Sequence, residues 1–182
     1  MIKKLRYVLF FLCGALLFAQ STVNPPITLP VSFQANFRQT ITNDQKKQII
    51  YQGKIDFSAP SHFKWRYSTP TKKEVCTDGV KLRVVDHDLE QVSNYMIDKG
   101  LDLPAILKSA KLHRKSVYVA KYQGKSYTIQ VNSRQELSRI AYKDDLDNTV
   151  LIIFSKMRYG KKKIPGAQMK CGYPDAYDRI GE

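Results

Sequence analysis

Short stretches in which apolar and polar residues alternate dominate this chain from residue 31 onwards. The first, residues 31–41, puts apolar side chains on one face and polar side chains on the other, which is typical of a half-buried β-strand. Comparable stretches recur at 49–57, 63–67, 75–77, 82–85, 91–97, 116–122, 126–131, 137–143 and 149–155, and residues 167–171 are a further candidate. The sequence therefore predicts about ten short strands, each with one apolar face.

Glycine marks a turn between two of these stretches and an irregularity inside another. Asp78-Gly79 separates two of them and is a strong signal for a tight hairpin turn. Gly53 sits at an inward position of the second stretch, where glycine indicates a bulge or a bend. Turns this frequent favour strands that run antiparallel to their neighbours.

Helical spacing appears in one short segment between the two groups of strands. Leu103, Ile106 and Leu107 recur at intervals of three and four residues. Asp102 is a plausible cap and Pro104 lies in the first turn, so we expect a helix over 103–110. One short helix cannot cover a large sheet. We therefore predict a mainly β fold, in which a single curled antiparallel sheet forms an incomplete β-barrel with a short helical lid; a two-sheet sandwich is the alternative.

The N-terminal region has the composition of an export signal. Lys3, Lys4 and Arg6 precede an apolar stretch that is short for a membrane span, and Ala19 offers a small residue for cleavage. We predict a signal peptide over 1–19 and export to the periplasm; a retained membrane anchor is the alternative. Residues 20–30 hold three prolines and read as an N-terminal arm, followed by one domain over 31–182.

The chain is strongly basic, with a formal net charge of +14 that falls to +11 without the three basic residues of the signal. Such a charge suits nucleic acid, anionic lipid head groups or acidic protein surfaces. Export argues against nucleic acid. The basic residues are spread along the chain apart from a dense run at 156–163, which is either a solvated loop or a docking site.

Two cysteines, Cys76 and Cys171, remain after the signal. In an oxidising compartment two thiols usually pair, so we expect a disulfide; two buried free thiols are the alternative. Closing a loop of this length stabilises a fold by about 4 kcal/mol in the chain-entropy model.

Motifs for catalysis and metal binding are absent from the sequence. His62, His87 and His113 lack the spacing of metal ligands. No nucleophile elbow, phosphate-binding glycine loop or Cys-x-x-Cys occurs. Asp86-His87-Asp88 is read as a polar turn. We therefore expect a protein that is not an enzyme and needs no metal or cofactor.

Several short motifs, in order, resemble the LolA family of periplasmic carriers of outer-membrane lipoproteins. They are Phe33-x-Ala35-x-Phe37-x-Gln39, Pro60-x-x-Phe63-x-Trp65-x-Tyr67-x-x-Pro70, Thr77-Asp78-Gly79, Leu89-Glu90-Gln91 and the helix that begins Leu103-Pro104. The resemblance covers about residues 31–110. Beyond them the chain matches only as alternating strands.

This resemblance implies a half-barrel whose apolar concave face binds acyl chains. The function it implies is that of a periplasmic chaperone, which takes acylated lipoproteins from an inner-membrane ABC-type releasing complex and delivers them to an outer-membrane acceptor, as a monomer. The acyl-chain cavity is then expected to be lined by Phe33, Phe37, Tyr51, Phe63, Trp65, Tyr67, Leu82 and Val84, and the lid to carry Leu103, Ile106 and Leu107. Aromatic residues at this spacing are otherwise ordinary core residues.

Two departures from the family concern the lid. Family members usually have an arginine before the proline that matches Pro60, and this arginine ties the lid closed; here the position is Ala59. They also usually open with an amphipathic helix, which the proline-rich arm cannot form. The alternative function is a periplasmic sensor or adaptor on a related half-barrel, which binds lipid or a protein partner without carrying it; a secreted hydrolase is a more distant one.

Overall fold

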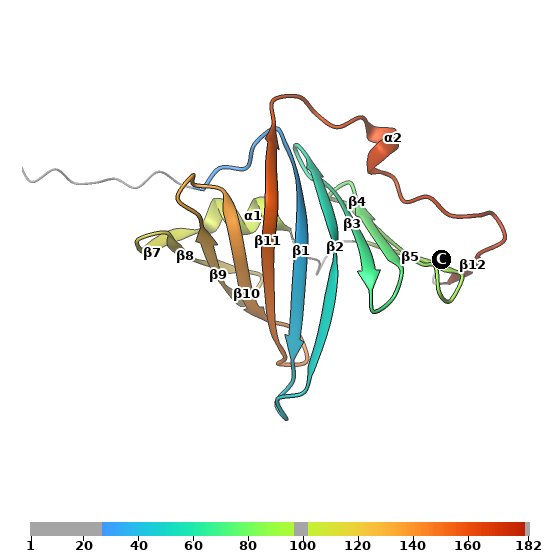
Figure 1. Cartoon of the computed structure of the whole chain (residues 1–182), viewed down its shortest axis with the longest axis horizontal. Coiled ribbons are helices and arrows are strands. Elements are labelled where there is room, and N and C mark those ends of the chain that lie inside the picture. The colour runs from blue at the N-terminus through green and yellow to red at the C-terminus, as the bar shows by residue number, and fades with distance from the viewer. Residues whose placement is uncertain (1–26, 97–101, 181–182) are drawn as a thin grey trace, which may run out of the picture.

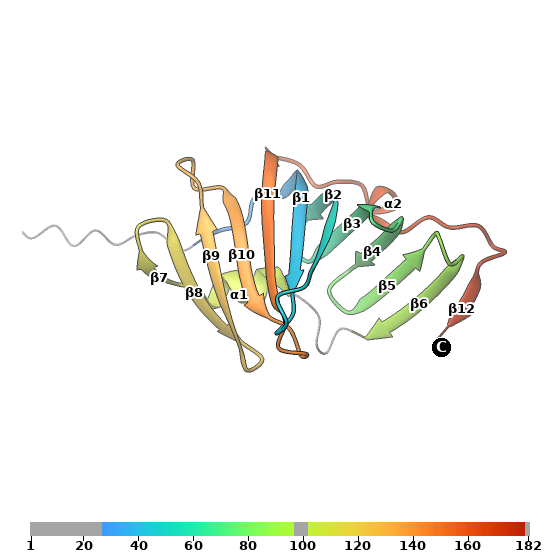
Figure 2. The same ribbon diagram turned by 60° about the horizontal axis from the view of Figure 1, so that its bottom comes forward.

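One twelve-stranded sheet makes up most of the structure, a computed structural model that describes residues 27–96 and 102–180. The sheet has the strand order β12-β6-β5-β4-β3-β2-β1-β11-β10-β9-β8-β7 and is antiparallel except for β12, which runs parallel to β6. It curls into an open half-barrel and does not close (Figures 1 and 2). The predicted fold class is confirmed. The predicted signal peptide and most of the arm lie outside the described residues.

The strands of the first half are β1 (Ser32–Thr42), β2 (Gln48–Ser58), β3 (His62–Thr69), β4 (Lys73–Thr77), β5 (Lys81–Asp86) and β6 (Gln91–Met96). The second half has β7 (Lys111–Arg114), β8 (Val117–Tyr122), β9 (Lys125–Val131), β10 (Leu137–Lys143), β11 (Thr149–Gly160) and β12 (Asp178–Ile180). The helices are α1 (Leu103–Ser109) and α2 (Gly166–Met169). Neither described helix has the length and apolar character needed to cross a bilayer.

The concave face carries the main hydrophobic core. Inward residues of neighbouring strands pair directly, as in Phe33 with Phe57 and Ile140 with Ile152. The helix α1 lies on this side, across β8 to β11, and contributes three buried side chains (Figure 2). Within the described residues no helix covers the concave side of β4 to β6. Half of the concave face is therefore packed and half is open.

Gly53 marks a bulge, as predicted from the sequence. The pairing of β2 with β3 shifts register between Gln52 and Gly53. A Cβ at this position would collide with the carbonyl oxygen of Arg66 and lie 2.9 Å from the ring of Phe37. Glycine is required here because a backbone and an aromatic ring both approach it closely.

We expect Gly53→Ala to lower the free energy of unfolding by about 1–3 kcal/mol, because the added methyl group must push β3 and Phe37 apart. Denaturant unfolding followed by circular dichroism measures this. Gly166→Ala is the matched control, since nothing lies within 4 Å of a Cβ built there. Equal stability of the two variants would contradict the close approach at Gly53.

A second, smaller core lies on the convex side under the C-terminal segment. Residues 161–177, here called the C-terminal strap, cross from β11 over β3 and β4 to β12 (Figures 1 and 2). Val85 and Val92 are buried beneath the strap, beside the disulfide between Cys76 and Cys171. The predicted strand over 167–171 is wrong. These residues form the end of α2 and an extended crossing, because the strap pairs with no neighbouring strand until β12.

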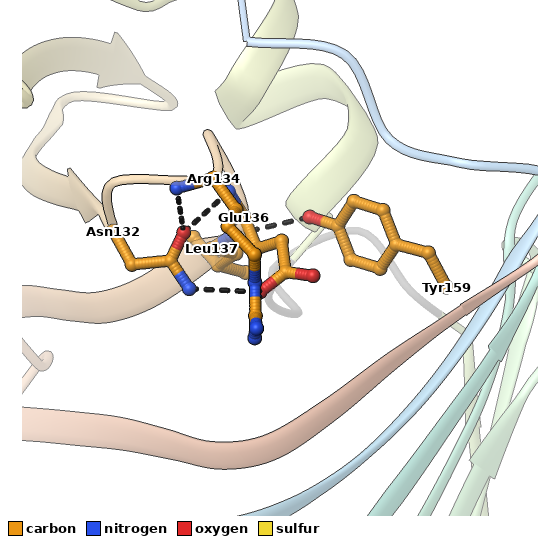
Figure 3. A network of polar contacts seen from close by, with 5 residues as sticks. All are labelled: Asn132, Arg134, Glu136, Leu137 and Tyr159. Atoms are coloured by element: carbon orange, nitrogen blue, oxygen red, sulfur yellow. Dashed lines mark hydrogen bonds and ion pairs between the residues drawn. The ribbon is translucent and has the colours of Figure 1, made fainter.

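Side-chain hydrogen bonds connect neighbouring elements at the end of the half-barrel where β1 begins. The hydroxyl of Tyr159 on β11 accepts from the backbone N–H of Leu137, at 3.1 Å (Figure 3). In the turn before Leu137, Asn132 and Glu136 are joined at 2.8 Å and Arg134 pairs with Glu136. The Leu137–Tyr159 bond ties the start of β10 to β11, and the other two contacts hold the β9–β10 turn in shape.

Candidate ligand cavity on the concave face

The open part of the concave face has an aromatic floor on β3. Phe63, Trp65 and Tyr67 point inward, while Lys64 and Arg66 point to the convex side. The neighbouring strand sets Val75 opposite Trp65, and β5 sets Val84 opposite Val75. This alternation follows from the two-residue period of the sequence. Strands β3 to β5 thus present one continuous apolar surface.

A cavity of about 160 Å³ lies between this surface and the start of α1. Its lining residues are Gln39, Phe63, Trp65, Tyr67, Val75, Thr77, Leu82, Leu103, Tyr142 and Ile152. They come from six strands and from the first residue of the helix. The structure therefore brings together residues that are far apart in the sequence.

Of the predicted cavity residues, Phe63, Trp65, Tyr67 and Leu82 line this cavity. Val84 lies on the same face of β5, beyond the cavity. Phe33 and Phe37 are buried at 1% and 3% exposure, as part of the packed core beside the cavity. Tyr51 lies edge-on to Tyr67, with ring centres 5.7 Å apart.

The helix α1 sits as a cover at one side of the cavity. Leu103, Ile106 and Leu107 are each 2% exposed or less and pack into the concave core. Asp102 caps the helix by accepting from the N–H of Ala105 at 3.1 Å, and the hydroxyl of Tyr122 reaches the same carboxylate at 3.5 Å. Because the three buried side chains pack α1 onto the concave core, its removal would uncover a wide apolar surface.

Ala59 faces the outer side of α1. It lines a surface hollow together with Pro104, Leu107 and Lys108 of the helix and with residues 27–30 of the arm. Ile27 and Leu29 of the arm pack against the main core. A longer side chain at position 59 would lie against the helix.

Three polar residues line the cavity although they were not predicted as cavity residues: Gln39, Thr77 and Tyr142. The hydroxyl of Tyr67 donates to Oε1 of Gln39 at 3.2 Å. Burial raises the pKa of Tyr142 to about 12, and burial also raises the pKa of Tyr67 above its ordinary value. The available signal for Gln39 was its position, because it continues the inward period of Phe33, Ala35 and Phe37.

The convex face has a different chemistry. Hollows over β1, β2, β3 and β11 are lined by polar and basic side chains, including Arg38, Lys54, Arg66, Lys156 and Arg158. Arg66 pairs with the buried Asp56 at 2.7 Å. The basic run at 156–163 begins on β11 and continues into the strap. The two faces of the sheet thus differ sharply in the described part of the chain: the cavity on the concave face is mainly apolar, and these convex hollows are polar and basic.

An open half-barrel with an apolar concave face, partly covered by one short helix, defines the class of this protein. Residues 31–119 match the family described as outer membrane lipoprotein carrier protein LolA. The chain belongs to this family, and the resemblance inferred from the sequence motifs is confirmed.

Relatives support the same assignment. The chain is 34% identical over 149 residues to an outer-membrane lipoprotein carrier protein of Campylobacter jejuni, covering 82% of this chain and 86% of that protein. It is 32% identical over 115 residues to the protein of the same name from Helicobacter hepaticus, covering 63% and 64%. A crystal structure of an uncharacterized conserved protein from Thermus thermophilus has a TM-score of 0.54 at 10% identity, covering 85% of this chain and 92% of the other, which supports the fold alone.

Proposed function

We propose that this protein is a periplasmic chaperone that binds the acyl chains of lipoproteins released from the inner membrane and delivers them to the outer membrane. The observation that carries the proposal is the apolar cavity between β3–β5 and α1, in a chain of the lipoprotein carrier family. The cavity lies on the open half of the concave face, where a ligand reaches it without crossing the sheet.

The energetics of lipid transfer require such a site. Each acyl methylene that leaves water contributes about 0.8 kcal/mol, so exposed acyl chains do not stay dissolved in the periplasm. A carrier must offer apolar surface when loaded and hide it when empty, because large bare patches lead to aggregation. The packed position of α1 corresponds to the empty state.

The cavity as it stands is too small to enclose acyl chains. Its volume of about 160 Å³ is below the range of roughly 300–1,000 Å³ that is usual for pockets holding drug-sized ligands. Either α1 moves, with Leu103 leaving the cavity, or the acyl chains extend over Val84 and the uncovered strands β4 to β6. Both routes start from the same aromatic floor.

The remaining assignments belong to the same proposal. The protein is exported by a signal peptide over 1–19 and acts as a single domain over 31–182, as a monomer and without enzymatic activity. Its partners are an inner-membrane ABC-type lipoprotein-releasing complex and an outer-membrane acceptor. Because the proposed compartment lacks nucleotide, the energy for loading comes from the partner.

Photo-crosslinking in cells tests the proposal. A photoreactive amino acid replaces Leu82, which is half-buried at the cavity, and mass spectrometry identifies the adducts. The same residue at Lys54, which is exposed on the convex hollow, is the control. We expect mature acylated lipoproteins at position 82 and none at position 54.

Other outcomes decide against the carrier function. A single protein partner at position 82, with no lipoproteins, would identify a sensor or adaptor. No adducts at position 82, with the protein folded, would leave the cavity without a ligand and contradict the proposal.

We expect Ala59→Arg to reduce binding of a hydrophobic dye to the protein without cargo. The new guanidinium would lie beside Pro104 and Leu107, within reach of α1 carbonyl groups. Hydrogen bonds from a charged donor contribute about 1.5–3 kcal/mol each, so the closed position of α1 would gain population. Dye fluorescence at equal protein concentration measures the effect.

Ala59→Met is the control for this variant, since it adds comparable length without any donor. Equal dye binding by Ala59→Arg, Ala59→Met and the unmodified protein would mean that the closed position of α1 does not depend on a latch at this place.

A further inference from the structure

Polar groups form a row across the concave face. The row lies between the side chains of Phe63 and Trp65 on one side and the turn that joins β1 to β2 on the other. Gln39 on β1 pairs with Tyr51 on β2, and Tyr142 on β10 pairs with Tyr127 on β9. Gln39 and Tyr142 line the cavity, together with Tyr67 on β3. Two residues beyond Tyr51, Ile49 is 53% exposed. The row therefore stands where the apolar surface meets water.

The hydrogen bond within the row leaves donors available to a ligand. The hydroxyl of Tyr67 donates to Oε1 of Gln39, so Nε2 of the same carboxamide is the remaining donor group of that side chain. Within the described part of the chain, no residue forms a hydrogen bond with the Tyr142 hydroxyl, so this donor is available as well. Both tyrosines are protonated at neutral pH, as an ordinary phenol is, and burial raises the pKa of each further.

The charge of the lining restricts the chemistry of the ligand. None of the ten lining residues is charged. A carboxylate or phosphate would therefore lose its hydration without gaining a cationic partner, which is costly. A neutral carbonyl oxygen accepts hydrogen bonds from an amide N–H or a phenol without that cost. Tyrosine is also suited to such a boundary, because its ring is apolar and its hydroxyl polar.

We infer that Nε2 of Gln39 and the hydroxyl of Tyr142 donate hydrogen bonds to the neutral ester or amide carbonyls at the head of an acylated ligand. Tyr67 orients the Gln39 carboxamide for this contact, and the acyl chains then point toward Phe63 and Leu103. The inference rests on the proposed function, since it concerns the same cavity. It adds the linkage that is recognised, and it predicts that free fatty acids and phospholipid head groups are disfavoured.

Intrinsic fluorescence provides the test, because Trp65 is the single tryptophan of the chain and lines the cavity. The probes are a synthetic triacylated lipopeptide with ester-linked chains and its ether-linked analogue of equal chain length. We expect the unmodified protein to prefer the ester form. Tyr142→Phe and Gln39→Leu, which each remove one of these donors, should each weaken binding of the ester form about 2- to 10-fold and change binding of the ether form little.

Tyr173→Phe is the matched control, since it removes a hydroxyl on the convex side. Equal weakening for ester and ether forms would mean that the row only shapes the cavity, and unchanged binding by both variants would exclude hydrogen bonding to the ligand; either result overturns the inference and leaves the carrier function standing. A wild-type protein that binds neither probe would contradict the proposed function and the inference together.

An orientation measurement needs no variant and therefore does not depend on the folding of one. A lipopeptide with a diazirine at the end of one ester-linked chain is bound and irradiated. We expect adducts on peptides that contain Phe63, Leu82 or Leu103. Adducts confined to the peptides of Gln39 and Tyr142 would show the reverse orientation and overturn the inference.

Discussion

Trp65→Glu is expected to abolish binding of acylated ligands while the fold is retained. Trp65 is half-buried at the centre of the cavity floor, with its ring 4.9 Å from that of Phe37 and 6.2 Å from that of Phe154. In the empty protein a glutamate at this place reaches water through the open side. Under a bound acyl chain it would be dry and unpaired, which costs several kcal/mol. Affinity should fall by about 100-fold or more.

The measurement is displacement of a fluorescent probe with an ester-linked acyl chain, with thermal unfolding as a check on the fold. Lys54→Glu puts the same side chain on the convex face and is expected to bind normally. Phe63→Glu should behave differently, since Phe63 is 4% exposed and its ring lies 4.7 Å from that of Phe57. We expect this variant to unfold.

Comparison of these variants separates a cavity residue from a core residue. Trp65→Glu with normal folding and normal ligand binding would contradict the cavity assignment. Trp65→Glu that fails to fold would place Trp65 in the structural core with Phe63. Release of lipoproteins from spheroplasts by each variant gives the corresponding functional result.

The two-residue period predicted the concave face well. It put Phe63, Trp65 and Tyr67 on one side of β3, and the structure has them there. The helix was predicted over 103–110 and is observed at Leu103–Ser109. These features were readable because a buried face imposes a pattern on every strand and helix that contributes to it.

The edge strands β7 and β12 were not predicted, because a strand without a buried face carries no apolar pattern. All residues of β7 and β12 are exposed, so no apolar pattern marks these strands. Met169 ends α2 and Cys171 lies in the extended crossing that follows; both are buried, and their two-residue spacing imitated a strand. Gln39 was missed as a cavity residue because a polar side chain on an inward face gives no sign of its partner, which here is Tyr67 on another strand.

Loss of the disulfide is expected to destabilise the protein by about 2–5 kcal/mol. Cys76 on β4 and Cys171 in the C-terminal strap have Cα atoms 5.7 Å apart and are separated by 95 residues. Replacing both cysteines by alanine avoids leaving a reactive thiol. Denaturant unfolding measures the change, and the absence of maleimide labelling in the unreduced, unfolded parent protein checks that the bond is present.

The loss should be concentrated in one half of the sheet. Besides the disulfide, the strap is held by Lys64, whose Nζ donates to the carbonyl of Lys170 at 2.7 Å, and by Glu74, which accepts from the N–H of Gly172 at 3.1 Å. In the described structure the strap is the second layer for β4 to β6, which have no helix on the concave side. The other half is packed on α1 and does not touch the disulfide.

Hydrogen exchange distinguishes a local role from a global one. In the double alanine variant we expect faster exchange in β4 to β6 and in the strap, with β8 to β11 nearly unchanged. Lys64→Met is the matched control: it removes the hydrogen bond to Lys170 and the ion pair with Glu74 but leaves the covalent link, so it should have a smaller effect. Uniformly faster exchange would mean that the disulfide supports the whole sheet. Faster exchange limited to β4–β6 would mean that the strap keeps the open half of the concave face in shape for its ligand.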